Sequence, residues 1–338
     1  NKQTHTSASK SSSKGINWQV ENTLTYDKTI GKHSFAVVLG QSAMKNKSDY
    51  LGGSRWNLVN VNKPSIDYAT GNYVQTIVTD KEGKIISVGT PTIQHSVYGG
   101  NNVVHTISSL FGRISYNYDE KYMFQATVRR DGSSRFGTNN KYGTFPSASV
   151  GWNIMNEKFM ESTRDWLSNL KFRASWGQLG NENALGYYDF LALISTYNDL
   201  YQGYVQGSGS SAWPGSIARG LENRSLKWET TDTKNIGFDF GFFNNHLSGN
   251  VNYYINETRD LLITRKLAPS AGLANPTLNV GKMRNQGFEL ELNWNDKVSD
   301  FEYNVGFNLS TVSNKVVSLA NEDQTIYGMG LKYGSEHF

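Results

Sequence analysis

The sequence has 338 residues, of which 37% are hydrophobic and 18% charged, and it contains no cysteine. No stretch approaches the ~20 consecutive apolar residues of a membrane-spanning helix. A net charge of +4 without a basic block argues against nucleic acid as a partner. The lack of thiols excludes cysteine-based metal sites and nucleophiles, and it favours an exported protein.

Apolar and polar residues alternate in runs of about ten residues, which is the pattern of a β-strand with one apolar and one polar face. In one such run Tyr122, Phe124 and Val128 point one way, whereas Gln125 and Arg129 point the other. We expect residues 1–15 to form a loop. The pattern then predicts about ten strands, which in chain order are 16–26, 34–43, 107–118, 122–131, 144–154, 170–179, 227–243, 247–262, 283–294 and 301–310.

The connections between these strands alternate between short and longer, as in transmembrane β-barrels with short periplasmic turns and long extracellular loops. The short ones are 27–32, 119–121, 155–169, 244–246 and 295–300, although 155–169 is assigned by parity rather than length and contains a helix-compatible stretch. The outer loops are then 44–105, 132–143, 180–226 and 263–282, of which 44–105 and 180–226 are the long ones. Tyr26, Tyr118, Tyr122, Trp294 and Phe301 fall together at the periplasmic level, as an aromatic girdle should.

A soluble β-sandwich or β-helix would also show alternation. Soluble strands average ~5–6 residues, whereas barrel spans need ~9–11, so the length of the runs favours the barrel. The first residues carry no apolar signal core, and both ends read as interior to a longer chain. We therefore expect residues 1–338 to be one segment of a larger, all-β, antiparallel transmembrane barrel with long extracellular loops.

Several motifs resemble the barrel of SusC/RagA-type TonB-dependent transporters. They are Arg130-Asp-Gly-Ser-Ser-Arg-Phe-Gly137, Tyr142-Gly-Thr-Phe-Pro-Ser-Ala-Ser-Val-Gly-Trp152, Leu170-Lys-Phe-Arg-Ala-Ser-Trp-Gly-Gln-Leu-Gly-Asn181, Leu226-Lys-Trp-Glu-Thr-Thr231 with Asn235-Ile-Gly-Phe-Asp239, and Asn279-Val-Gly-Lys-Met-Arg-Asn-Gln-Gly-Phe-Glu289. The resemblance spans about Leu110 to Leu309, and residues before Leu110 match in pattern only.

The resemblance implies a barrel of 22 strands with an N-terminal plug, in a Gram-negative outer membrane. It also implies a SusD-like lipoprotein lid, import of oligosaccharides or peptides with energy from the TonB complex, and pairing of two transporter–lid units. The plug and the TonB box do not occur in this sequence, so TonB would act through a part of the protein outside it. The barrel surface would contact outer-membrane lipid.

The residues that carry the family motif read as structural. They are Asp131, Gly132, Arg135, Gly137, Pro146, Trp152, Gly177, Trp228 and Gly287. We predict that an Asp131–Arg135 ion pair fixes the loop at the outer strand end. Gly151, Gly177 and Gly180 suit bends or the close approach of a plug. The other reading is that these residues bind substrate directly.

Aromatic residues concentrate in the loop 180–226, with glycine and serine between them. They include Tyr187, Tyr188, Tyr197, Tyr201, Tyr204 and Trp213. Such side chains stack on sugar rings, hold peptides or pack against a partner protein. We expect them to contact the lid or the ligand.

No nucleophile elbow, phosphate-binding loop or zinc-protease motif is present, and the 6 histidines are scattered. Glu289 and Glu291 share one strand face, which fits either paired carboxylates or a polar wall that packs on the plug. We expect no catalytic residue, no metal site and no cofactor. An outer-membrane barrel enzyme and a passive porin or adhesin are the alternative functions.

Overall fold

The computed structural model describes residues 6–74, 77–79, 85–88, 92–99, 103–196, 216–218, 220–265, 267–268, 270 and 272–319. The chain divides into two units. Residues 1–19 and 44–106 form the first, and residues 20–43 and 107–338 form the second. Among the described residues no helix has the length and apolarity needed to cross a membrane.

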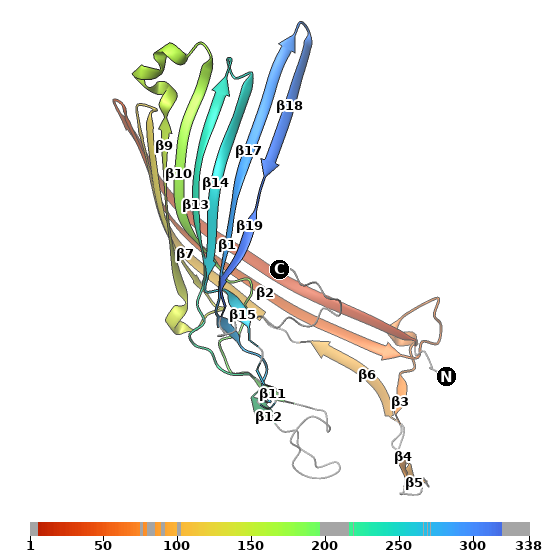
Figure 1. The fold of residues 1–338 in the computed structure, drawn as a ribbon. Helices are drawn as coiled ribbons and strands as arrows, with labels where there is room; N and C mark the ends of the chain where they lie inside the picture. The colour runs from red at the N-terminus through yellow and green to blue at the C-terminus, as the bar shows by residue number, and fades with distance from the viewer. Residues whose placement is uncertain are drawn as a thin grey trace. The chain divides into compact units, whose positions relative to one another are not determined.

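The second unit is one antiparallel sheet in which nearly every strand pairs with its neighbour in the sequence (Figure 1). The hydrogen-bonded order is β18-β17-β14-β13-β10-β9-β8-β7-β2, with β1 on β2 and β19 on β17. The strands are β1 (Ser7–Ile30), β2 (His33–Trp56), β7 (Val103–Tyr118), β8 (Tyr122–Ser133), β9 (Tyr142–Asn153), β10 (Leu167–Asn181), β13 (Glu229–Phe242), β14 (Leu247–Arg259), β17 (Lys282–Val298), β18 (Phe301–Ser310) and β19 (Ser313–Ser318).

All ten predicted strands are present. The two-residue alternation of apolar and polar side chains gives every strand one apolar face, and these faces lie on the same side of the whole sheet. The apolar residues predicted to share a face do so. Tyr116, Phe124 and Val150 lie opposite one another across β7, β8 and β9. Phe238, Val251 and Leu290 do the same across β13, β14 and β17. We call this side the apolar face and the opposite side the polar face.

Side chains on the apolar face are exposed although they are hydrophobic. Val128 is 51% exposed, Ile236 46% and Phe307 52%. A contiguous exposed apolar surface of this kind needs a nonaqueous environment. The sheet is therefore built to face lipid on this side.

Tight turns join the strands at one end. Asp119 and Glu120 between β7 and β8 have φ of 52° and 56°, a pair of left-handed residues that matches the right-handed twist of a hairpin. Phe243, Asn244 and Asn245 also have positive φ, in the turn between β13 and β14. The 3₁₀ helices η3 (Ile154–Asn156) and η4 (Lys158–Thr163) form the longer connection between β9 and β10, slightly before the stretch expected to be helical.

In the first unit, two segments that the sequence predicts as loops are partly strand. Residues Ser7–Gly15 belong to β1, and β2 runs on to Trp56, so the expected loops at 1–15 and 44–105 are partly strand. Backbone pairing in a long hairpin needs no apolar side chains, which is why the Ser/Lys-rich segment gave no signal. The 44–105 segment also contains η1 (Ile66–Tyr68), β3 (Asn72–Val74), β6 (Thr92–Gly99) and a hairpin formed by β4 (Ile77–Thr79) and β5 (Ile85–Val88).

The described part of the long loop after β10 contains little regular structure. A small hairpin forms from β11 (Ile194–Thr196) and β12 (Ser216–Ala218). A second one forms from β15 (Leu262–Thr264) and β16 (Thr277–Asn279) after β14. The η2 helix (Thr138–Asn140) lies between β8 and β9. These segments share the end of the sheet opposite the tight turns.

Candidate functional site

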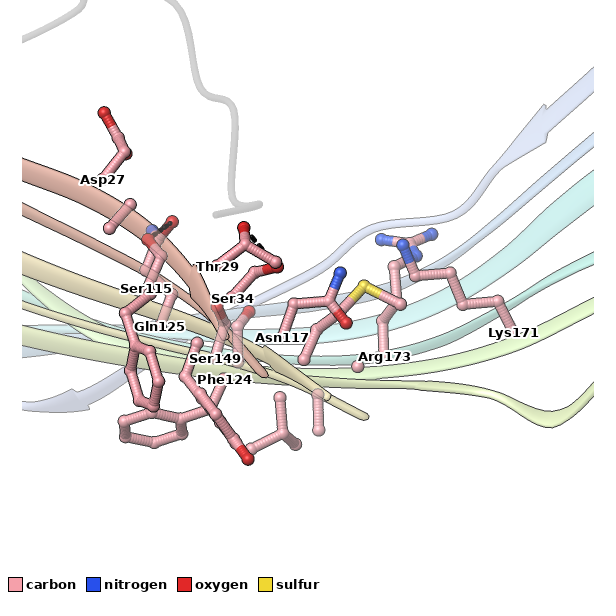
Figure 2. Close-up of a pocket in the computed structure, with 18 of the residues that line it drawn as sticks. Asp27, Thr29, Ser34, Ser115, Asn117, Phe124, Gln125, Ser149, Lys171 and Arg173 are labelled. Atoms are coloured by element: carbon pink, nitrogen blue, oxygen red, sulfur yellow. Dashed lines mark hydrogen bonds between the residues drawn. The ribbon is translucent and has the colours of Figure 1, made fainter. Parts of the chain in front are cut away.

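A groove of about 520 Å³ runs across β1, β2, β7 to β10 and β13, and its lining combines polar-face side chains with Phe35, Tyr116, Phe124 and Val150. Figure 2 shows polar side chains of its lining, which come from successive strands. They include Asp27, Thr29, Ser34, Ser115, Asn117, Gln125, Ser149, Lys171 and Arg173. These side chains offer both hydrogen-bond donors and hydrogen-bond acceptors, which suits a polar solute or a polar protein surface.

Charge on the polar face is fixed by a chain of hydrogen bonds across four strands. Arg173 donates to both carboxylate oxygens of Asp239, at 2.8 Å from Nε and 2.6 Å from Nη2, in the fork geometry of a strong pair. Its Nη2 also donates to Asn252 Oδ1 at 3.2 Å. Asn252 and Asn250 continue the chain to Glu291. Glu291 is thus held by amides as part of a polar wall, and it is not paired with Glu289.

The polar face offers little chemistry beyond binding. Among the described residues, Lys171 has no ion-pair or hydrogen-bond partner, so it places a positive charge in the groove. No group of three or more histidine, aspartate and glutamate side chains that could hold a metal ion occurs in the described part of the chain.

At the loop end, five side chains form a small hydrophobic core, which we call the loop platform. One comes from the connection between β8 and β9, one from β9 itself and three from the connection between β10 and β13. They are Phe136, Phe145, Leu185, Leu226 and Trp228. Leu226 is completely buried. The Trp228 ring lies 4.8 Å from the ring centre of Phe136 and 5.6 Å from that of Phe145. Aromatic pairs at these spacings pack favourably beyond their area of burial.

Hydrogen bonds to backbone carbonyls tie the same loops together. Arg135 Nη1 donates to Glu182 O at 3.2 Å, and Asn140 Nδ2 donates to Ser225 O at 3.0 Å. Asn223 Nδ2 donates to Thr277 O at 2.9 Å. Asn279 Nδ2 donates to the carbonyls of Lys227 and Asp260. The platform is therefore a preformed structure with its own core.

Two of the six predicted contact residues are described, and they closely follow Leu185 of the platform in the chain. Tyr187 is 37% exposed and Tyr188 44% exposed, and the Arg135 guanidinium stacks 5.2 Å from the centre of the Tyr187 ring. Leu191, Leu193 and Leu221 of the same loop are also exposed. The other four, Tyr197, Tyr201, Tyr204 and Trp213, lie outside the described residues.

The predicted Asp131–Arg135 pair is wrong. Asp131 accepts from Arg129 Nε at 2.7 and 2.8 Å, and Arg129 Nη2 reaches Ser109 at 3.0 Å. Asp131 and Arg129 lie two apart on the same strand face, so they meet directly. Arg135 has already left the strand and turns to Glu182 and Tyr187 instead.

The remaining motif residues have structural positions. Pro146 opposes Val128 in the sheet, Gly177 opposes Ser147, and Gly137 precedes η2. A Cβ on Gly132 would meet the Tyr142 ring, and one on Gly287 would meet Thr311 O. Gly180 lies against the Phe145 ring in the same way, so its close neighbour is a ring of the platform core. Trp228 Nε1 donates to Lys141 O at 3.3 Å.

Glu157 is a structural residue that the sequence did not reveal. It accepts hydrogen bonds from Tyr122 Oη at 2.5 Å and Trp152 Nε1 at 3.2 Å, and Lys121 Nζ lies 3.3 Å away. The bond from Tyr122 and then those from Trp152 and Lys121 lower the pKa of Glu157 from its ordinary value. It fixes the η3–η4 connection to the girdle, where the rings of Tyr122 and Trp152 stack. In the sequence, Glu157 follows Trp152 by five residues, and this spacing is the feature that could have indicated their contact.

Comparison with known proteins now decides the family. A model described as "TonB dependent receptor-like, beta-barrel" matches residues 1–334. The chain belongs to this family. The match confirms the resemblance read from the motifs, and the chain is a segment of an outer-membrane β-barrel.

Curated relatives and a solved structure agree. TonB-dependent receptor P3 of Formosa agariphila is 32% identical over 305 residues, which is 90% of this chain and 27% of the relative. TonB-dependent receptor SusC of Bacteroides thetaiotaomicron is 35% identical over 225 residues, covering 66% of this chain and 22% of SusC. The RagAB peptide transporter superposes with a TM-score of 0.74 at 25% identity, over 92% of this chain and 31% of that one. The chain thus spans a third or less of these relatives.

Proposed function

We propose that this chain is part of the wall and outer rim of an energised outer-membrane importer for an oligomeric nutrient. The loop platform carries this proposal. A preformed core that presents Tyr187 and Tyr188 at the end of a lipid-facing sheet is suited to bind a partner or an oligomer at the entrance.

The substrate we propose is a peptide or an oligosaccharide. One structural relative is described as a peptide transporter, which supports the peptide. The polar groove with Lys171 and the Arg173–Asp239 pair is compatible with either, because both ligands present hydrogen-bonding groups. The partners we propose are a SusD-like lipoprotein lid at the platform and the TonB complex through a part of the protein outside this sequence. Two transporter–lid units would pair.

The remaining proposals follow the expected orientation. The loops after β8, β10 and β14 face outside, and the tight turns face the periplasm. Tyr197, Tyr201, Tyr204 and Trp213 belong to the same proposed contact surface. An outer-membrane enzyme or a passive pore would not depend on TonB energy.

The test uses the full-length transporter in cells, with uptake of a fluorescent peptide pool and of a fluorescent oligosaccharide pool as readouts. Replacing Tyr187 and Tyr188 by alanine should reduce uptake of one pool at least fivefold and weaken co-purification of the lid. Tyr68→Ala is the matched control, because Tyr68 is 59% exposed in the first unit. Uptake that persists after the proton-motive force is collapsed would contradict import. Unchanged uptake and lid binding in the double variant would contradict the role of the platform.

A further inference from the structure

The apolar face changes its chemistry abruptly at one level of the sheet. Phe242, Leu247 and Trp294 lie opposite one another near the tight turns, and all are apolar. Asp232, Glu257 and Arg284 lie opposite one another on the same face, ten residues farther along each strand. For strands tilted by about 40°, ten residues correspond to roughly 25 Å, the height of the apolar band of a barrel. The charged row therefore lies at the other edge of the hydrocarbon layer.

Positive charge exceeds negative charge at this edge. Glu257 is neutralised by Lys282 at 2.6 Å and by Arg284 at 2.7 Å. Asp232 accepts from Gln178 at 2.9 Å and lies 3.5 Å from Arg259. We call the set the basic belt. Its cations are Lys234, Arg259, Lys282, Arg284 and Lys315, and its carboxylates are Asp232 and Glu257.

Lys234 supplies charge that the belt itself does not neutralise. It is exposed, and among the described residues it has no carboxylate partner. The two carboxylates hold Arg284 and Arg259 in place, so that their remaining N–H groups are oriented rather than free to rotate. A fixed guanidinium beside a free ammonium is a favourable arrangement for a phosphate.

A depression of about 370 Å³ lies in the middle of the belt. It is lined by Trp176, Asp232, Lys234, Ile255, Glu257 and Arg284. Its apolar part, Trp176 and Ile255, continues into the apolar band through Ile236 and Tyr253. Trp176 is 39% exposed, at the interfacial depth where tryptophan is commonly found in membrane proteins. The depression thus has an apolar side toward the membrane and a charged side away from it.

We propose that the basic belt binds the phosphate groups of outer-leaflet lipid, with Lys234 and Arg284 as the principal contacts and Trp176 and Ile255 against the acyl chains. The excess of positive charge fits an anionic headgroup. The apolar side distinguishes a lipid from free phosphate, which has nothing to place there. The assignment of the belt to the outer leaflet rests on the proposed orientation of the loops. Binding of lipid phosphate by the belt does not depend on that orientation.

The test measures the thermal midpoint of the full-length protein in neutral detergent micelles. Three additions are compared, namely a bisphosphorylated glucosamine glycolipid, the same glycolipid after enzymatic removal of its phosphates, and inorganic phosphate. We expect only the phosphorylated glycolipid to raise the midpoint, and 0.5 M salt to reduce the shift. In the variant Lys234→Gln with Arg284→Gln, the apparent affinity should fall at least fivefold. Glu257 keeps Lys282 as its partner in this variant, so no carboxylate is left unpaired.

The matched control removes one lysine and one arginine from the polar face, as Lys171→Gln with Arg113→Gln. It should retain the shift. An equal loss in the control, an equal response to the dephosphorylated glycolipid, or an equal response to inorganic phosphate would each overturn the proposal. If the double variant does not fold, Lys234→Glu alone changes an exposed side chain and should weaken binding further than Lys234→Gln. Nutrient uptake is not a readout, so failure here is separate from failure of the import proposal.

Discussion

Removing the centre of the loop platform should release the loops while the sheet stays intact. Leu226 is completely buried among Phe136, Phe145, Leu185 and Trp228. Leu226→Ala removes buried carbon atoms and leaves a cavity, which together cost about 3 kcal/mol in a tightly packed core. Because the platform core has so few members, this loss acts on local opening rather than on the long hydrogen-bond ladders of the strands.

Hydrogen–deuterium exchange of the full-length protein in nanodiscs measures this opening. A loss of about 3 kcal/mol corresponds to about hundredfold faster exchange. We expect that change in residues 182–193 and 220–228, with little change in β8 and β13. Leu221→Ala is the control, because Leu221 is 48% exposed in the same loop and its truncation should cost about 0.5 kcal/mol or less. Unchanged exchange in 182–193, or an equal rise in the strands, would refute the idea of a separate platform core.

Two further predictions use the same exchange measurement. The lowered pKa of Glu157 means that its contribution is complete above its ordinary pKa of 4.5 and is lost as the pH falls through the lowered value. Opening of the 154–166 connection, corrected for intrinsic exchange, should therefore increase below pH 4.5 in the wild type, and Glu157→Gln should remove this pH dependence. Gly180→Ala places a Cβ against the Phe145 ring and should cost about 1–3 kcal/mol, with faster exchange in 220–228. Gly220→Ala, where a Cβ meets nothing within 4 Å, should change little.

Most strands were predictable because the alternation of apolar and polar residues lies within each strand's own sequence. Alternation in 122–131 or 283–294 is visible within the segment, and β8 and β17 contain these ranges. The strand at Ser7–Gly15 was missed because Ala8 is the one apolar side chain among its serines and lysines, so no alternation is visible, and its order comes from pairing with β2. Backbone pairing leaves no trace in side-chain chemistry.

The candidate site was less predictable, because its parts come together only in the folded chain. Phe136 lies in the connection between β8 and β9, and Leu185 and Leu226 lie far apart in the long connection between β10 and β13, so no local pattern joins them. Tyr187 was identified from aromatic content, but its partner Arg135 was assigned to Asp131. The nearer Arg129 competes for the same carboxylate, and strand geometry decides in its favour. The basic belt could not be predicted without the strand register, because only the register places Asp232, Glu257 and Arg284 side by side.

The sequential order of the sheet has a consequence for how the protein is assembled. From β7 to β18 each long strand pairs with the long strand that precedes it, across turns such as the one at Asp119 and Glu120. Where a tight turn joins two strands, the pairing step closes a short loop, whereas β13 pairs with β10 across the long 182–228 connection. Each added strand contributes one row of hydrogen bonds to an existing edge. The sheet can grow hairpin by hairpin as it enters the membrane, and at each stage the unpaired polar backbone is confined to the growing edge and the opposite one.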